Sequence, residues 1–433
     1  MLLQRLDLRG ITDDRAQLRD RLPQPVDEQE RSADLVAAII ADVRTDGDAA
    51  LRRLTERFDG VVLDDLRVPP TELDAALARV PTELRDALEV AARRISDYHA
   101  HEAASGEVGD VESEGITVRH LVRPVGRAGC YAPGGRARYP STVLMCAVPA
   151  RVAGVDEVVL CVPPGPDGRV DDATLAAAAV AGVDEVYRVG GAQAIAAMAY
   201  GTPSISPVDV IVGPGNRYVA EAKRQVSGVV GVASAFAGPS EVVVVAGPEA
   251  PADLAAIDLV VQAEHGPDGL AWLVTWSEDV ADAVSEQVEA IVAASPRRAD
   301  LEATLSTGGY IVVVDEPARA LDVANVVAPE HLELLTDEAE SLLPLVRSAG
   351  AVFLGPSSPA SVGDYLAGPN HVLPTNRTAR FASALRVDDF RCHIHAVTVS
   401  DQALTTLGPR VVTLAEVEGL PAHAESVRRR WPS

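Results

Sequence analysis

Basic side chains are scarce in this 433-residue sequence, and their scarcity argues against one large class of partner. Lys and Arg together number 38, against 63 Asp and Glu, which gives a formal net charge of -25 at pH 7. A surface that binds nucleic acid needs clustered positive charge to neutralise phosphates. We therefore expect no nucleic acid among the partners, and we infer little else from the charge beyond good solubility.

Cysteine is also sparse. The four cysteines, Cys130, Cys146, Cys161 and Cys392, form neither a dense disulfide framework nor a Cys-x-x-Cys metal motif. A reducing compartment suits such a set, so we expect a cytoplasmic protein. Cys130 and Cys146 could act as nucleophiles in aldehyde oxidation, but no flanking base accompanies them, which favours buried thiols.

Long apolar runs are missing as well. The most apolar stretch, 143–155, is interrupted by Pro149 and Arg151 and is shorter than the ~20 residues that a membrane helix needs. Charged residues interrupt the N-terminal stretch 1–9 too early for a signal peptide. We expect no membrane partner.

Apolar residues are abundant, and their pattern predicts an α/β fold. They make up 47% of the chain, enough for more than one domain with a full core. The segment Ala-Gly-Val-Asp-Glu-Val occurs at 153–158 and again at 181–186, a spacing close to the roughly 30 residues of a βαβ unit. We predict two Rossmann-like, incomplete parallel-sheet domains, a helical N-terminal segment and a small C-terminal extension. The predicted strands of the two sheets are 158–162, 186–189, 208–212, 241–246, 271–275, 309–314 and 351–355.

Two glycine-rich turns follow predicted strands. The segments 189–193, Val-Gly-Gly-Ala-Gln, and 212–216, Val-Gly-Pro-Gly-Asn, each lead into a helix. Such turns let a backbone approach a phosphate at a helix N-terminus. Neither contains the full GxGxxG fingerprint, so ordinary turns between strand and helix explain them about equally well.

Gln262-Ala-Glu-His265 closes an apolar helical pattern just before the helix-stopping pair Gly266-Pro267. Residues three apart share a helix face, so Gln262 and His265 could direct an amide oxygen and an imidazole at one metal ion. A solvated helix end would explain the same residues without a metal.

Other polar residues lie near the ends of predicted elements farther along the chain. Glu330 and His331 are adjacent and cannot share one helix face, but at a turn both could reach one substrate. They could equally cap a helix, just as Asp364 could stabilise a glycine turn. His371 is a further polar residue of this kind and lies in loop 363–375. This loop combines Gly, Pro, Asn, Asp and His, a composition typical of functional loops.

His393 and His395 form a rival metal pair, because alternate residues of a strand point to the same side. The surrounding segment 391–399 is typical of an ordinary strand, and we favour that interpretation.

Six motifs together resemble those of the histidinol dehydrogenase family, from about Tyr131 to the end of the chain. The N-terminal helices resemble the family only in general character. In order, the motifs are Gly213-Pro-Gly-Asn216, Ala237-Gly-Pro-Ser240-Glu, Gln262-Ala-Glu-His265-Gly-Pro, Ala328-Pro-Glu330-His331-Leu-Glu, Gly363-Asp364-Tyr with Asn370-His371-Val-Leu-Pro-Thr, and Glu418-Gly-Leu-Pro-Ala-His423.

The resemblance implies a zinc- and NAD-dependent enzyme that oxidises L-histidinol to L-histidine through a bound aldehyde, the last step of histidine biosynthesis. It implies one Zn²⁺ per subunit and Glu330 and His331 as the acid/base pair. The implied zinc ligands are Gln262, His265, Asp364 and His423. The resemblance implies that the zinc ligands and the acid/base pair also contact the substrate, together with Ser240, His371 and Glu418. It implies contacts to NAD for Tyr131, Gln193 and Asn216.

The resemblance also implies a homodimer with shared active sites. The C-terminal tail of the family reaches the partner subunit, so we expect Glu418 and His423 to complete the neighbour's site. The expected domains are an N-terminal arm (1–26), a zinc-binding catalytic domain (27–125 together with 236–380), an inserted NAD-binding domain (126–235) and a dimerisation tail (381–433). Without GxGxxG, we expect NAD to bind in a shallow, weak site.

Two departures from the family's motifs stand out. Ala360 occupies a position, four residues before Asp364, where an acidic residue is expected, and segment 232–236 lacks an expected Asp. The first removes a carboxylate from the surroundings of the substrate's amino group.

Two other functions fit parts of the pattern. A zinc hydrolase could use Glu330 with metal-bound water and would need no cofactor. A non-catalytic α/β protein could bind histidinol without turnover, although the intact Glu-His pair argues against it.

Overall fold

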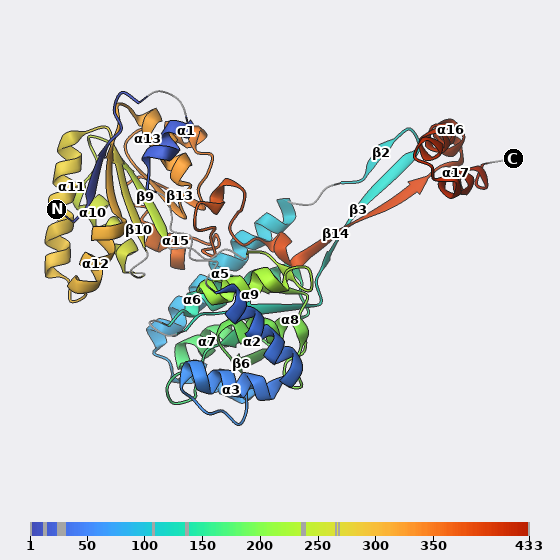
Figure 1. The fold of residues 1–433 in the computed structure, drawn as a ribbon, viewed down its shortest axis with the longest axis horizontal. Coiled ribbons are helices and arrows are strands. Elements are labelled where there is room, and N and C mark those ends of the chain that lie inside the picture. The colour runs from blue at the N-terminus through green and yellow to red at the C-terminus, as the bar shows by residue number, and fades with distance from the viewer. Residues whose placement is uncertain are drawn as a thin grey trace.

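The computed structural model shows two parallel β-sheets, each covered by helices, and an arm that extends away from both (Figure 1). It describes residues 2–11, 15–23, 32–105, 109–134, 138–234, 240–264, 266 and 269–431. The predicted α/β class, with two parallel-sheet units and a C-terminal extension, is confirmed. Among the described residues, no helix combines the length and the apolar character needed to cross a membrane.

The first sheet has six parallel strands in the order β1-β11-β10-β9-β12-β13. Its central strands are buried on both faces, as a parallel sheet between two helical layers requires. The strands are β1 (Gln4–Asp7), β9 (Glu241–Ala246), β10 (Leu270–Thr275), β11 (Gly309–Val313), β12 (His331–Leu335) and β13 (Ala351–Leu354).

Helices cover both faces of this sheet. One face packs against α10 (Ala252–Ala263), α11 (Glu278–Ala294) and α12 (Arg298–Gly308). The other packs against α1 (Arg15–Arg21) and α13 (Pro317–Val327). Two expectations change here: β1 makes the N-terminal arm an edge strand of this sheet, and β12 is a strand that the sequence pattern did not predict.

The second sheet has five parallel strands in the order β6-β5-β4-β7-β8. Its strands are β4 (Arg127–Tyr131), β5 (Glu157–Val162), β6 (Glu185–Arg188), β7 (Val210–Val212) and β8 (Gly231–Val232). Helices α6 (Pro140–Ala153) and α7 (Asp172–Val180) pack on one face, and α8 (Gly191–Tyr200) and α9 (Arg217–Val226) on the other.

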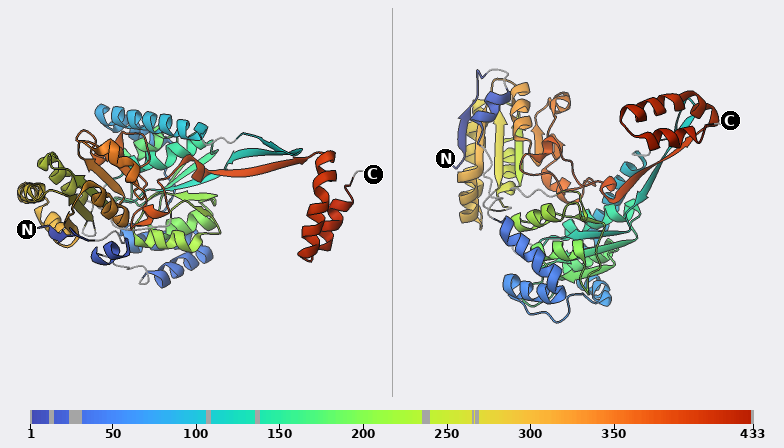
Figure 2. Two further views of the ribbon diagram at one scale, coloured as in Figure 1. Left: turned by 90° about the horizontal axis from the view of Figure 1, so that it is seen from above. Right: turned by 45° about the vertical axis from the view of Figure 1, so that its right-hand side comes forward.

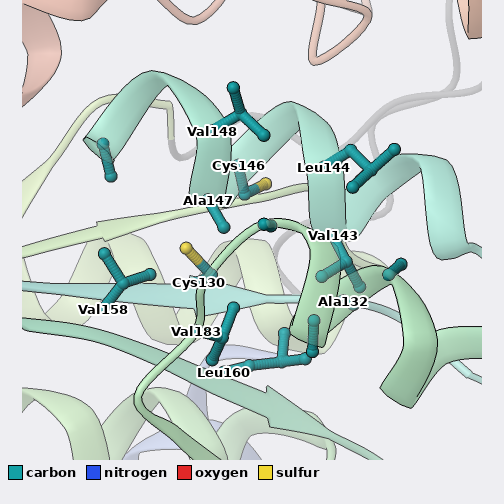
Figure 3. Packing of buried hydrophobic residues seen from close by; sticks show 14 of the residues in the cluster. Cys130, Ala132, Val143, Leu144, Cys146, Ala147, Val148, Val158, Leu160 and Val183 are labelled. Carbon is teal, nitrogen blue, oxygen red and sulfur yellow. The ribbon is translucent and has the colours of Figure 1, made fainter. Parts of the chain in front are cut away.

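Three cysteines lie within this second unit and are buried. Figure 3 shows Cys130 and Cys146 facing each other between β4 and α6, among Val143, Ala147 and Leu160. Burial raises the pKa of the Cys146 thiol to about 12. A thiol with so high a pKa is a poor nucleophile at neutral pH, and this supports a packing role.

The N-terminal helices pack on the five-stranded sheet, and not on the six-stranded sheet with which the prediction grouped residues 27–125. Helices α2 (Ala33–Asp46) and α3 (Asp48–Asp59) pack against α8 and α9, and α4 (Pro70–Arg79) and α5 (Thr82–Ser105) against α6 and α7. The reason is visible in α8, which is apolar on all sides and almost wholly buried. A helix of that kind needs a second helical layer outside it.

An antiparallel ribbon forms the arm. It contains β2 (Val111–Ser113), β3 (Ile116–Pro124) and β14 (Arg391–Val399), in the order β14-β3-β2. The ribbon projects from the body and carries α16 (Asp401–Val417) and α17 (Pro421–Arg428) at its far end (Figures 1 and 2). Among the described residues, the buried core between α16 and α17 consists of Val412, Ala415 and Ala424, with Val427 and Trp431 packed partly buried against it.

Candidate active site

Two neighbouring central strands of the six-stranded sheet begin with polar side chains. Glu241 is the first residue of β9 and His331 the first of β12, and Ser240 and Glu330 directly precede them. These four residues therefore lie at the amino-terminal edge of the sheet. Ligands of open α/β sheets usually bind at the carboxyl edge, so this site is placed at the opposite edge.

Glu330 is held by hydrogen bonds from β9. Its Oε2 accepts the hydroxyl of Ser240 and the backbone N–H of Glu241, the latter at 3.2 Å. A left-handed residue, Ala328 with φ 51°, ends α13 and turns the chain toward β12, which brings Glu330 into this position. Among the described residues no hydrogen bond falls on Oε1, so that oxygen remains available to a bound molecule.

A second carboxyl group lies beside Glu330 and is more deeply buried. Glu241 is 1% exposed, and its Oε2 has no hydrogen-bond partner among the described residues. Burial, and then the nearby charge of Glu330, raise the pKa of Glu241 to about 8. The site thus contains a carboxyl group that keeps its proton at neutral pH beside one that accepts hydrogen bonds.

The imidazole of His331 lies between two carboxylates. Its Nε2 is 3.3 Å from Oδ1 of Asp364, and its Nδ1 is 3.8 Å from Oε2 of Glu330. Burial by itself lowers the pKa of His331, but the charges of Glu330, Asp364 and Glu333 outweigh it and raise the pKa to about 9. Within the described chain neither ring nitrogen has a well-directed hydrogen bond, so both can serve a substrate.

Gln262 and Asp364 line one small cavity together with His331. Gln262 is buried at the end of α10, and its Nε2 lacks a hydrogen-bond partner among the described residues. Asp364 lies on the short helix α15 (Ala360–Tyr365), although the sequence predicted a loop there. Ala360 itself donates its backbone N–H to Oε1 of Glu333, at 2.9 Å.

His371 connects this site to the second sheet. Its Nδ1 is 2.7 Å from the carbonyl oxygen of Asp364, and its Nε2 is 3.4 Å from Oγ1 of Thr142 in the first turn of α6. The neighbouring Asn370 donates its amide to the carbonyl oxygen of Met145, also on α6. Helix α6 follows β4, so the loop with His371 lies at the carboxyl edge of the five-stranded sheet.

An open cleft of about 960 Å³ runs beside these residues. His331, Asp364 and His371 line it, with β13 on one side and Tyr98 of α5 on another. Cavities that hold small ligands have volumes of roughly 300 to 1,000 Å³. The cleft is therefore large enough for a small substrate.

The three predicted NAD contacts lie at the carboxyl edge of the five-stranded sheet. Tyr131 ends β4, and its hydroxyl accepts the backbone N–H of Gly191 at 3.0 Å. Gln193 lies in the first turn of α8 and is buried. Asn216 is exposed and caps α9 by accepting the N–H groups of Tyr218 and Val219. Their role in binding NAD stays a prediction.

The structure separates two predicted site residues from the others within one chain. Glu418 ends α16 and His423 lies on α17, both exposed, and Figure 2 shows these helices at the far end of the arm. His265 lies outside the described residues. No three His, Cys, Asp or Glu side chains converge as a metal site among the residues that the structure describes.

The donors that do converge are suited to zinc. Gln262 offers an amide and Asp364 a carboxylate, and Zn²⁺ accepts mixed oxygen and nitrogen ligands. The atom of Gln262 that could bind a metal is its amide oxygen, because the amide nitrogen Nε2, which is buried without a partner among the described residues, is a hydrogen-bond donor. These two side chains fit a metal whose remaining ligands come from elsewhere.

The other candidate histidines lie far along the chain, on the arm. His393 and His395 share a face of β14 with His120 of β3, and Nδ1 of His393 is 2.8 Å from Nε2 of His120. His393 is also 3.7 Å from Asp388. The imidazoles of this rival pair thus contact another histidine, and His393 also contacts a carboxylate.

Sequence reasoning missed three carboxyl groups at the site, two of them buried and one, Asp258, half-buried. Glu241 and Glu333 lie within apolar strands, and Asp258 lies on α10 one turn before Gln262. Burial, followed by Asp258, raises the pKa of Glu333 to about 8. A charged residue inside an apolar strand is costly unless it has partners, and that cost was the available signal.

Comparison with known proteins places these residues in a family. The sequence model of the histidinol dehydrogenase family matches residues 22–431. The chain is 50% identical over 398 residues to histidinol dehydrogenase of Parasynechococcus marenigrum, which covers 91% of this chain and 90% of that one. It is 48% identical over 404 residues to that of Gluconobacter oxydans, covering 93% of each. The crystal structure of histidinol dehydrogenase from Elizabethkingia anophelis superposes with a TM-score of 0.91, at 36% identity, over 99% of this chain and 98% of that one.

Proposed function

Because this chain belongs to the histidinol dehydrogenase family and is therefore an oxidoreductase, we propose that it oxidises L-histidinol to L-histidine with zinc and NAD in two successive steps. The observation that supports this most is that His331 lies between the carboxylates of Glu330 and Asp364 and lines one small cavity with Asp364 and Gln262. The unit around the six-stranded sheet binds substrate and metal, and the five-stranded unit binds NAD.

Gln262 and Asp364 would hold the zinc ion together with His265 and with His423 of the partner subunit. Bound zinc would serve to orient the substrate, whose nitrogen atoms are suitable metal ligands. NAD supplies the hydride acceptor for each step. The hydroxyl of Ser240, the imidazole of His371 and the carboxylate of Glu418 of the partner subunit contact the substrate.

The neutral form of His331 accepts the proton of the alcohol in the first oxidation. The flanking carboxylates raise the pKa of His331 to about 9, so this form grows as the pH rises, and they stabilise the imidazolium that results. The ring nitrogens lack well-directed protein hydrogen bonds among the described residues. Glu330 then accepts a proton from the water that hydrates the aldehyde, through the oxygen that Ser240 and Glu241 leave free. His331 thus acts as the base in the oxidation of the alcohol, and Glu330 acts as the base in the hydration of the aldehyde.

Tyr131, Gln193 and Asn216 contact NAD at the carboxyl edge of the five-stranded sheet. This edge adjoins the substrate loop through His371 and Thr142. The cofactor must leave after the first step while the aldehyde stays, which calls for a weak cofactor site. Turns without GxGxxG provide it.

The enzyme acts as a homodimer with shared sites. The arm leaves apolar side chains uncovered: Val417 is 83% exposed, Leu414 is 64% exposed and Val397 is 60% exposed. Surfaces of that kind are typical of protein interfaces. A partner that covers them would carry Glu418 and His423 with its own arm. Four free cysteines suit a cytoplasmic setting.

The test is a stoichiometric assay on the purified protein with zinc, L-histidinol and NAD. We expect two NADH for each histidine formed, followed by absorbance of NADH and by amino-acid analysis. A protein that forms no NADH under these conditions does not have the proposed function. Cleavage of an amide substrate without NAD would favour a zinc hydrolase instead.

A further inference from the structure

Helix α10, strand β12 and helix α15 carry candidate site residues, and each also contributes a second residue to one contact around Glu333. Asp258 lies one turn before Gln262 on α10, and Ala360 lies one turn before Asp364 on α15. Glu333 lies two residues after His331 on β12, on the same side of the strand. A spacing of four residues on a helix, or of two on a strand, returns to the same face. The second residues therefore lie on the faces that carry the site.

Direct contacts join these second residues. The carboxyl groups of Asp258 and Glu333 are hydrogen-bonded to each other, which requires one of them to carry a proton. Oε1 of Glu333 also accepts the backbone N–H of Ala360, at 2.9 Å. Glu333 is 4% exposed, so water does not compete effectively for these bonds.

The same two carboxyl groups line the cavity of Gln262, His331 and Asp364. Glu333 therefore links α10 on one side to α15 on the other, through bonds that end one turn from Gln262 and from Asp364. Helix α15 has only six residues, and a helix so short depends on contacts outside itself.

We propose that Asp258 and Glu333 are positioning residues, which set the distance between Gln262 and Asp364 by joining α10 to α15 across β12. This inference rests on the proposed zinc site. Partners that orient metal ligands from outside the ligand shell typically change metal affinity by about 10- to 100-fold when they are removed.

The test compares Glu333→Ala with Glu333→Gln. The amide of Gln can accept the N–H of Ala360 and donate to Asp258, so Glu333→Gln keeps both bonds without a shared proton. We expect Glu333→Ala to weaken zinc binding by about 10- to 100-fold in competition with a chromophoric chelator, and Glu333→Gln to stay near wild type. Amide hydrogen exchange in segment 360–365 should increase in Glu333→Ala and stay near wild type in Glu333→Gln.

Ala360→Pro removes only the backbone N–H that residue 360 donates to Glu333. This variant replaces Glu333→Ala in the test if Glu333→Ala does not fold. Proline is tolerated at the first position of a helix, and the preceding Pro359 already has the extended ψ of 150° that a following proline requires. The matched control is Glu249→Ala, because Glu249 also accepts a backbone N–H, from Asp337, outside the site.

The two readouts separate this inference from the proposed function. Exchange in segment 360–365 needs no zinc, so it tests the positioning contact even in a protein that does not bind the metal. The inference is overturned if Glu333→Ala and Ala360→Pro leave exchange in this segment unchanged. It is also overturned if Glu333→Gln loses as much zinc affinity as Glu333→Ala does.

Discussion

The chemistry of this protein depends on how few partners its buried polar atoms have. Glu330 receives both of its hydrogen bonds on one oxygen, and His331 receives none with good geometry among the described residues. A fold that stabilised itself fully would pair these groups. Leaving them open makes the side chains available to a substrate.

Replacing His331 by Asn tests its role as a base. We expect kcat to fall by about 10²- to 10⁴-fold, the usual contribution of a general base, because Asn cannot accept the alcohol proton. Zinc content, measured by atomic absorption, should stay at the wild-type level. If His331→Asn instead lost its metal, His331 would be a ligand and the zinc assignment would have to change.

Glu241 makes folding stability depend on pH. Its pKa is raised from 4.5 to about 8, so between these values the folded protein keeps a proton that the unfolded chain releases. The free energy of unfolding must therefore fall as pH rises through this window. Because Gln cannot ionise, urea midpoints of Glu241→Gln should fall less than those of wild type between pH 5 and pH 8.

Glu249→Gln provides the contrast for that experiment. Burial is the largest single effect on Glu249, but hydrogen bonds from Thr336 and Asp337 outweigh it, and the net pKa is lowered. The contribution of Glu249 to stability is lost as pH falls, which is the opposite direction. Equal behaviour of Glu241→Gln and Glu249→Gln would contradict the interpretation of Glu241.

At the scale of elements, short connections place the site. Three residues, 328–330, join α13 to β12, and two residues, Val189 and Gly190, join β6 to α8. The four-residue turn after β7 packs closely against β4. Gly213 has φ +106°, and a Cβ there would lie 2.0 Å from the carbonyl oxygen of Tyr131.

Gly213→Ala should therefore displace the turn that leads to Asn216. Gly228→Ala is the matched control, because Gly228 also has a positive φ, +95°, but open space where a Cβ would lie. Both variants carry the left-handed strain of roughly 1 to 2 kcal/mol, and only Gly213→Ala adds a clash with backbone. We expect the KM for NAD to rise at least about tenfold in Gly213→Ala alone, measured at saturating histidinol. Equal KM values would remove this turn from the cofactor site.

At the scale of the whole molecule, the arm separates the ends of one chain's own site. Glu418 and His423 belong to α16 and α17, which lie beyond the ribbon of β3 and β14, and both views of Figure 2 show these helices far from the six-stranded sheet. Only a second copy of the chain can bring a tail to this cleft if the arm keeps the described conformation. The uncovered apolar residues of α16 would contact that copy.

Mixing two inactive variants tests the shared sites. Subunits carrying His331→Asn and subunits carrying His423→Ala should each form inactive dimers. In a mixed dimer, one of the two sites receives an intact His331 and an intact tail, so random mixing should restore about a quarter of wild-type activity. The measurement is NADH formation after the two proteins are unfolded and refolded together. No recovery would mean that each tail serves its own chain.

The sequence by itself determined the class of fold and the types of residue at the site. Strand and helix patterns depend on local periodicity, which is why most strands and the α/β class could be predicted. The residues Gln262, Glu330, His331 and Asp364 could be named because they lie in motifs that resemble those of the histidinol dehydrogenase family, and their roles stay predictions.

Tertiary structure alone decided which elements contact one another. Helices α2 to α5 follow the N-terminus, yet they cover α6 to α9, because only the buried faces of those helices needed a second layer. β12 was missed because the alternation His-Leu-Glu-Leu is too short to distinguish a strand from the end of the preceding helix, and its burial depends on β9 and β13 beside it. The link from Asp258 through Glu333 to Ala360 joins segments that are distant in sequence, and no local pattern encodes such a contact.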